Sequence, residues 1–182
     1  MTRQTASANI LKHELAVTVR EKSKAAANTV FDTLADLSSH PAWGGAEASR
    51  LLSIDAPVRP AMGGTEFTST AEDAICRMWD SSVVTEAARP ATFEKVTESR
   101  LETKRGGTPA QWLLVHRYEI EPDGVGSRIT YTCRLVRADA LPGPLALFGI
   151  PVLRTFSYRE WARASRQGLR RLVAAAEIKP RA

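Results

Sequence analysis

The sequence predicts one α+β domain in which a curved antiparallel sheet of seven strands wraps around a long C-terminal helix. Three observations predict this fold. Runs of alternating apolar and polar residues, separated by turn residues, fill positions 46–137. A short helical stripe of apolar residues follows the first strand, and a much longer stripe lies near the C-terminus. The long helix must bury its stripe, and the concave face of a twisted sheet is the only large surface available. We therefore expect space between the helix and the sheet.

The first elements are a strand and two short helices. Residues 14–22 alternate apolar and polar side chains, which is typical of a half-buried strand. We expect Ser23 to cap the following helix, which carries apolar residues at helical spacing over 27–34. Residues 37–45 hold turn formers around Trp43, so they predict a short second helix or a tight corner.

The central part of the chain predicts six further strands. Pro and Gly clusters interrupt the alternating runs, and short connections favour antiparallel pairing of consecutive strands. The predicted strands cover residues 48–54, 65–71, 75–86 and 92–101, followed by the two strands of a hairpin at 111–137 that turns at 121–127.

This hairpin has an inner face of unusual composition. Successive strand side chains point to opposite faces, so each strand contributes every second residue to the inner one. That face holds Trp112, Leu114, His116, Tyr118, Ile120, Ile129, Tyr131, Cys133 and Leu135. His116 is the only histidine that the alternation places inside. An imidazole, two phenols and an indole among aliphatic side chains indicate the wall of a pocket for a largely apolar molecule.

In the segment 75–80 either set of alternate residues could face inward, because both of its faces carry large and polar groups. If Arg77 and Trp79 face inward, the guanidinium could anchor a carboxylate or polarise a carbonyl. In the other phase Cys76 and Met78 line the cavity, and Arg77 is a solvated surface charge.

The C-terminal part combines a long connection with the longest helix. Residues 138–151 contain Pro and Gly breakers, and the apolar run 145–153 predicts a gate or a packing contact. A helix over 152–177 carries an apolar stripe that includes Trp161 and Ser165. Its arginines at 159, 163, 166 and 170 form a basic ridge, which we interpret as a solvated face rather than a nucleic-acid surface.

Composition bounds the remaining classes. The 182 residues fit one domain at 14–177, with a flexible N-terminal tail at 1–13 and a C-terminal tail at 178–182. No apolar run reaches the length of about 18 residues that a membrane span needs, and the N-terminus lacks the apolar core of a signal peptide. We therefore expect a cytoplasmic protein.

The basic charge is local, since residues 154–182 hold eight Lys and Arg against two Asp and Glu. Two cysteines and three histidines show no zinc-site spacing, so we predict no metal.

The order of elements resembles the START-like or SRPBCC superfamily, and within it the polyketide cyclase and dehydrase-like branch that is common in bacteria. The resemblance covers roughly residues 14–177. The matching segments are 30–36 (VFDTLAD) running into 40–43 (HPAW), 84–86 (VTE) before Arg89-Pro90, 116–122 (HRYEIEP) with 126–131 (GSRITY), and 169–177. This resemblance implies a helix-grip fold with a deep cavity between sheet and closing helix, which in the superfamily holds sterols, lipids, phenolics or polyketide chains.

The sequence therefore predicts binding of a hydrophobic or aromatic small molecule, such as a lipid, a polyketide or a related metabolite. The alternative is a cofactor-free cyclase, aromatase or dehydratase that uses the same cavity, with His116 as acid or base and with Tyr118 and Arg77 as further catalytic candidates. Trp43 and Trp161 have a second interpretation, as side chains that fill the wedge beside the helices. We expect no cofactor, no nucleic acid and a monomer or homodimer. The predicted ligand-binding residues are Trp43, Trp79, Trp112, Leu114, His116, Tyr118, Tyr131, Cys133, Trp161 and Ser165.

Overall fold

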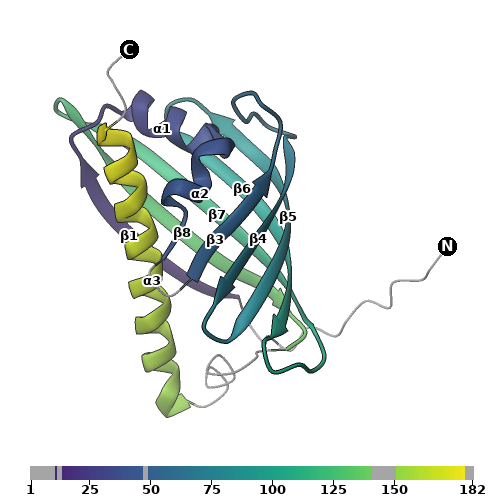
Figure 1. Cartoon of the computed structure of the whole chain (residues 1–182). Helices are drawn as coiled ribbons and strands as arrows, with labels where there is room; N and C mark the ends of the chain where they lie inside the picture. Colours follow the sequence, from purple (N-terminus) through teal and green to yellow (C-terminus); the bar gives the residue numbers. More distant parts are fainter. Residues whose placement is uncertain (1–10, 12–13, 47–48, 141–150, 179–182) are drawn as a thin grey trace.

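One antiparallel sheet curls around the C-terminal helix α3 (Pro151–Ile178) in the computed structural model, which describes residues 11, 14–46, 49–140 and 151–178 (Figure 1). The strand order is β1-β8-β7-β6-β5-β4-β3-β2. The predicted tails, apart from Leu11 and Ile178, and residues 145–150 of the predicted gate at 145–153 lie outside the described residues. The strands are β1 (Leu15–Ser23), β2 (Gly45–Ala46), β3 (Ser49–Asp55), β4 (Glu66–Asp73), β5 (Cys76–Ala88), β6 (Thr92–Thr103), β7 (Ala110–Asp123) and β8 (Gly126–Ala138).

The predicted helix-grip fold is confirmed. All seven predicted strands form, and the two-residue strand β2 adds a short pairing to β3. Between β1 and β2 lie helix α1 (Ala27–Ala35), the 3-10 turn η1 (Leu37–Ser39) and helix α2 (His40–Trp43). Figure 1 shows these short helices near one end of the sheet, with α3 lying along its concave side.

The expected cap at Ser23 is wrong. Helix α1 starts after Ala26, which makes no side-chain capping bond, while Ser23 is the last residue of β1. The Ser23 hydroxyl instead accepts a hydrogen bond from Ala25 N–H at 3.0 Å and donates to Oε1 of Glu177 at 3.2 Å. Ser23 therefore fastens the end of β1 to α3 rather than starting α1.

Three elements meet at this junction. In the last turn of α3, Glu177 Oε1 also accepts the backbone N–H of Lys24 at 2.7 Å. From β8, the Ser127 hydroxyl donates to the Ala25 carbonyl at 2.9 Å, and Ser127 is completely buried. Hydrogen bonds to a charged acceptor contribute more than neutral ones. The junction thus fixes one end of α3 against the sheet.

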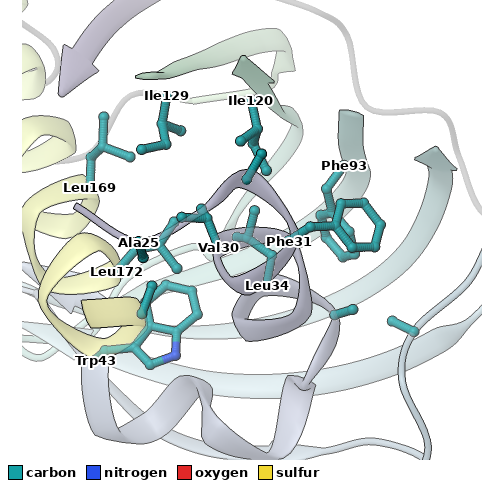
Figure 2. Close-up of a cluster of buried hydrophobic side chains, with 14 of the residues drawn as sticks. Ala25, Val30, Phe31, Leu34, Trp43, Phe93, Ile120, Ile129, Leu169 and Leu172 are labelled. Carbon is teal, nitrogen blue, oxygen red and sulfur yellow. The ribbon is translucent and has the colours of Figure 1, made fainter. Parts of the chain in front are cut away.

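Apolar side chains fill the interior in two separate clusters. The larger one joins α1, the sheet and the C-terminal half of α3, and Figure 2 shows its members pointing toward one another. Leu172 of α3, Val30 of α1 and Phe93 of β6 are fully buried there, each stabilising the fold by about 2 kcal/mol. The smaller cluster consists of Leu15, Leu135 and Ala138, with Trp112, Leu114, Tyr158 and Trp161 packed against it.

The basic ridge of α3 is partly neutralised by the sheet. Glu21 of β1 accepts a hydrogen bond from Nε of Arg170 at 2.9 Å, and Nε of Arg166 lies 3.9 Å from the same oxygen. Both arginines remain exposed, so these pairs contribute little to stability. Among the described helices, none is long and apolar enough to cross a membrane.

Gly126 offers a test of the junction. A Cβ at this position would lie 2.1 Å from the carbonyl oxygen of Ser23, which is backbone and cannot rotate away. We expect Gly126→Ala to lower the free energy of unfolding by about 1–3 kcal/mol in urea denaturation. Gly63→Ala is the matched control, since its Cβ would only meet Thr85 O at 3.9 Å. Equal effects of the two substitutions would contradict the packing described here.

Candidate functional site

A cavity of about 340 Å³ lies between the sheet and α3. Members of both hydrophobic clusters border it: Leu34, Phe67 and Leu169 from the larger cluster, and Trp112 and Trp161 from the partners of the smaller one. The remaining wall comes from inward-facing residues of β3 to β8 and from residues of α2 and α3. The cavity is therefore the space that the two clusters leave unfilled.

The hairpin residues reach this wall through the pairing register. His116 of β7 lies opposite Cys133 of β8, and Tyr118 lies opposite Tyr131, with the two phenol rings stacked at 4.6 Å between centroids. Trp112 and Leu114 continue the same face of β7. The structure thus places all six hairpin residues that the sequence assigned to a ligand site on the cavity wall.

Two helices supply the opposite wall. Trp43 of α2 and both Trp161 and Ser165 of α3 line the cavity. Trp43 also belongs to the larger cluster and donates from Nε1 to Ser39 Oγ at 3.2 Å, so it fills the wedge and borders the cavity at once. Trp161 likewise packs against the smaller cluster while it borders the cavity. The two interpretations of these tryptophans are compatible.

Arg77 and Trp79 do not face the cavity, so the interpretation in which both side chains point inward is wrong. Pairing with β4 and β6 puts Met78 and Asp80 on the inner face, and both line the cavity. The Arg77 guanidinium lies 3.9 Å from Glu72 on the outer face. Trp79 is 38% exposed, and the guanidinium of Arg100 stacks over its ring at 5.7 Å. Arg77 can therefore neither anchor nor polarise a ligand in the cavity.

A polar band crosses the inner face, and of its residues the sequence pattern predicted only His116 as a site residue. We define the polar band as the lining residues Ser69, Asp80, Lys95, Thr97, Ser99 and His116. Lysine is rarely found inside proteins, which made Lys95 easy to overlook. The signal was the alternation Phe93, Lys95, Thr97, Ser99, Leu101, in which an apolar residue at each end marks the inward face.

Lys95 is the cation of this band. It lies directly opposite His116 across the β6–β7 pair, and its Nζ lies 5.1 Å from the centroid of the Phe67 ring. Burial lowers the pKa of Lys95, while the charge of Asp80 opposes that shift. Nζ forms no hydrogen bond and no ion pair within 4.0 Å with any residue that the structure describes.

Asp80 is held by hydroxyl groups. Its Oδ2 accepts a hydrogen bond from the Ser69 hydroxyl at 3.3 Å, and Ser99 also donates to the carboxyl group. Burial raises the pKa of Asp80 against these two bonds and the charge of Lys95. The inner face therefore carries one acid and one base that do not contact each other directly.

The candidate catalytic groups of the hairpin keep one protonation state near pH 7. Nδ1 of His116 and Oη of Tyr131 share a hydrogen bond of 2.8 Å. Burial lowers the pKa of His116 to about 3, with the charge of Lys95 acting in the same direction, so the imidazole is neutral near pH 7. Burial also raises the pKa of Tyr118 and of Tyr131, and it raises the pKa of the Cys133 thiol to about 11.

His40 is a second inward histidine, contrary to the expectation that His116 is the only one. It is 6% exposed, its Nε2–H donates to the Leu34 carbonyl at 2.8 Å, and its ring packs on Trp43 at 4.4 Å. Burial lowers the pKa of His40 to about 4, and the charge of Lys95 adds to this shift. Strand alternation could not find it because α2 places it.

Within the described residues, no group of three His, Cys, Asp or Glu side chains is arranged to hold a metal ion. Both cysteines are free and buried.

Solved structures share the fold at low sequence identity. A protein from Rhizobium leguminosarum is 14% identical with a TM-score of 0.62, over 92% of this chain and 97% of that chain. Protein CV1439 from Chromobacterium violaceum is 11% identical with a TM-score of 0.61, over 90% and 98%. Ara h 8.0201 is 12% identical with a TM-score of 0.56, over 90% and 97%. No family model matches the sequence, and no curated protein matches it. These likenesses extend over most of the chain and show the fold alone.

The buried neutral His40 predicts acid sensitivity. In the unfolded chain it takes up a proton below about pH 6.5, whereas in the folded protein it does so only near pH 4, so stability falls as the pH drops through this window. The depression corresponds to about 3 kcal/mol at the acid end. We expect His40→Gln to remove this share of the pH dependence of the unfolding free energy, relative to its value at pH 8. Parallel pH profiles of the two proteins would contradict the buried neutral state.

Proposed function

We propose that this chain binds a largely apolar small molecule in the cavity between the sheet and α3. The observation that carries the proposal is an unfilled space of about 340 Å³ between two hydrophobic clusters. Binding pockets for small molecules have volumes of roughly 300–1,000 Å³ and combine apolar walls with a few placed polar groups. The cavity has both features.

The composition of the wall favours an aromatic or lipid-like ligand. Three strands and the helix present ring surfaces to the cavity, namely those of Phe67, Trp112, Tyr118, Tyr131 and Trp161. Aromatic side chains provide large apolar contact areas that lose little conformational freedom on binding. The polar band can hydrogen-bond to the polar end of such a ligand and so orient it. A lipid, a polyketide or a related metabolite has this division between body and end.

The enzyme alternative is less well supported than binding. A general acid or base works best when its pKa is near the working pH. The pKa of His116 is about 3 and that of Tyr118 is raised, so both groups hold their protonation state near pH 7. Arg77, the third candidate, lies on the outer face. The three groups thus fit a binding wall better than a proton-transfer site.

The cytoplasmic location, the monomeric or homodimeric state, and the absence of nucleic-acid binding stay predictions from the sequence.

Filling the cavity tests the proposal. Ser165 of α3 lines the cavity, so Ser165→Trp places an indole in the ligand space, whereas Arg163 on the exposed face of the same helix does not line it. We expect Ser165→Trp to weaken binding of the neutral probe anthracenemethanol, followed by fluorescence, by about tenfold or more because steric overlap removes its contact area.

The control Arg163→Trp adds the same side chain outside and should bind the probe as the parent protein does. Native mass spectrometry of protein exposed to a metabolite extract gives a second readout, in which the parent but not Ser165→Trp retains an apolar ligand. Equal probe affinity in both variants would refute binding in this cavity.

A further inference from the structure

We propose that the cavity takes a carboxylate ligand, an apolar body with one anionic end, and that Lys95 binds the carboxylate. This inference rests on the proposed function, since it names the chemical class of the bound molecule. It starts from the one cation that faces the cavity among the described lining residues.

The position of Lys95 is unusual for a lysine. It lies in the middle of the inner face of β6, two residues from Phe93, which is fully buried. Glu94 and Glu98 lie an odd number of residues from Lys95 in β6, so their side chains point to the opposite, outer face of the sheet. The side chain crosses toward β4, where Nζ lies over the ring of Phe67. The ammonium is therefore held at the cavity wall and cannot extend to the outer surface of the sheet.

The ammonium has unused hydrogen-bonding capacity. A lysine carries three N–H donors. The Phe67 ring offers only its π face at 5.1 Å, and no described residue accepts a hydrogen bond from Nζ or lies within 4.0 Å as a carboxylate. Buried charges in proteins are normally paired or hydrogen-bonded. Lys95, half-buried at the cavity wall, has no such partner among the described residues, and a ligand carboxylate would supply one.

The neighbouring titratable groups do not supply the missing negative charge by contact. His116, directly opposite, is neutral because burial lowers its pKa to about 3, and the Cys133 thiol beyond it stays protonated because burial raises its pKa to about 11. His40 across the cavity is neutral too, with a pKa of about 4. The charge on Lys95 therefore meets only one ionisable acid, Asp80.

Asp80 does not occupy the ligand position. Its carboxyl group is bound by the hydroxyls of Ser69 and Ser99, on β4 and β6. Burial raises the pKa of Asp80, while its bonds to the two serines and the charge of Lys95 oppose that shift. Thr97, between Lys95 and Ser99 on β6, already shares a hydrogen bond of 2.9 Å with Ser82. The hydroxyls of Ser69, Thr97 and Ser99 thus have partners within the sheet, whereas the three N–H donors of Lys95 have none among the described residues.

The energetics favour an anion over an uncharged polar group. Lys95 is half-buried at the cavity wall, so folding has already removed part of its side chain from bulk water and only the rest of the desolvation cost falls on binding. An entering carboxylate loses its own hydration but gains a charge-assisted hydrogen bond in a low-dielectric site. An alcohol of the same shape gains only a weaker bond to the same ammonium. The ring systems of Tyr118, Tyr131 and Trp161 would receive the apolar body.

A matched pair of probes tests the inference. Anthracene carboxylate and anthracenemethanol share one apolar body and differ only in the polar end. We expect the full-length protein at neutral pH to bind the carboxylate about tenfold more tightly than the alcohol in fluorescence titrations. Lys95→Met keeps the length of the side chain without its charge. It should lower the affinity for the carboxylate more than the affinity for the alcohol, so that the two probes bind within about twofold of each other.

Two further variants separate charge from structure. Lys95→Arg keeps the positive charge and should retain a preference for the carboxylate. Lys104→Met removes a lysine that pairs with Glu72 at 3.2 Å outside the cavity, and it should bind both probes as the parent protein does. If the parent protein binds both probes equally, or if Lys95→Met weakens both alike, the carboxylate inference is wrong while cavity binding stands. If the parent protein binds neither probe, the proposed function itself fails.

Discussion

One helix cannot fill the concave face of a curled sheet of eight strands, and this mismatch of volumes shapes the molecule. Helix α3 approaches both edges of the sheet. It packs along β1, and at the other edge a Cβ at Gly168 would lie only 3.3 Å from the carbonyl oxygen of Gly45 in β2. The apolar side chains then gather where α3 and α1 come closest to the sheet, in one large and one small cluster. A cavity remains between them because no third element covers the middle strands within the described residues.

Different parts of the interior carry the packing that holds the fold and the polar groups that line the cavity. The two clusters and the junction at Ser23, Ser127 and Glu177 carry the packing and hydrogen bonds that hold the helix. The middle strands need not exclude water to keep the fold, so they can carry hydroxyls, an acid and a lysine on the inner face without a matching loss of packing. Ser82 with Thr97, and Ser69 with Asp80, satisfy each other within the sheet. Lys95 has no such partner, which makes it the residue whose state depends most on what occupies the cavity.

The fold and one wall of the site could be predicted from sequence because both follow from period-two and helical spacing. The hairpin alternation places His116, Tyr118, Tyr131 and Cys133 correctly on the inner face. The phase of 75–80 could not be predicted, because large and polar residues occupy both faces and only the register with β4 and β6 selects Met78 and Asp80. His40 is buried through the path of α2 and the Leu34 carbonyl, which strand alternation does not describe. Lys95 was missed because residue preference and alternation disagree there, and the alternation decides.

The central claim is that an apolar molecule enters the space between the two clusters. A crystal structure of the protein grown with anthracenemethanol tests it most directly. The ring system should lie between the sheet and α3, in contact with Leu114, Tyr131 and Trp161. A structure in which the ring lies on the outer face beside Trp79, or in which the two clusters meet and leave no space, would contradict the claim.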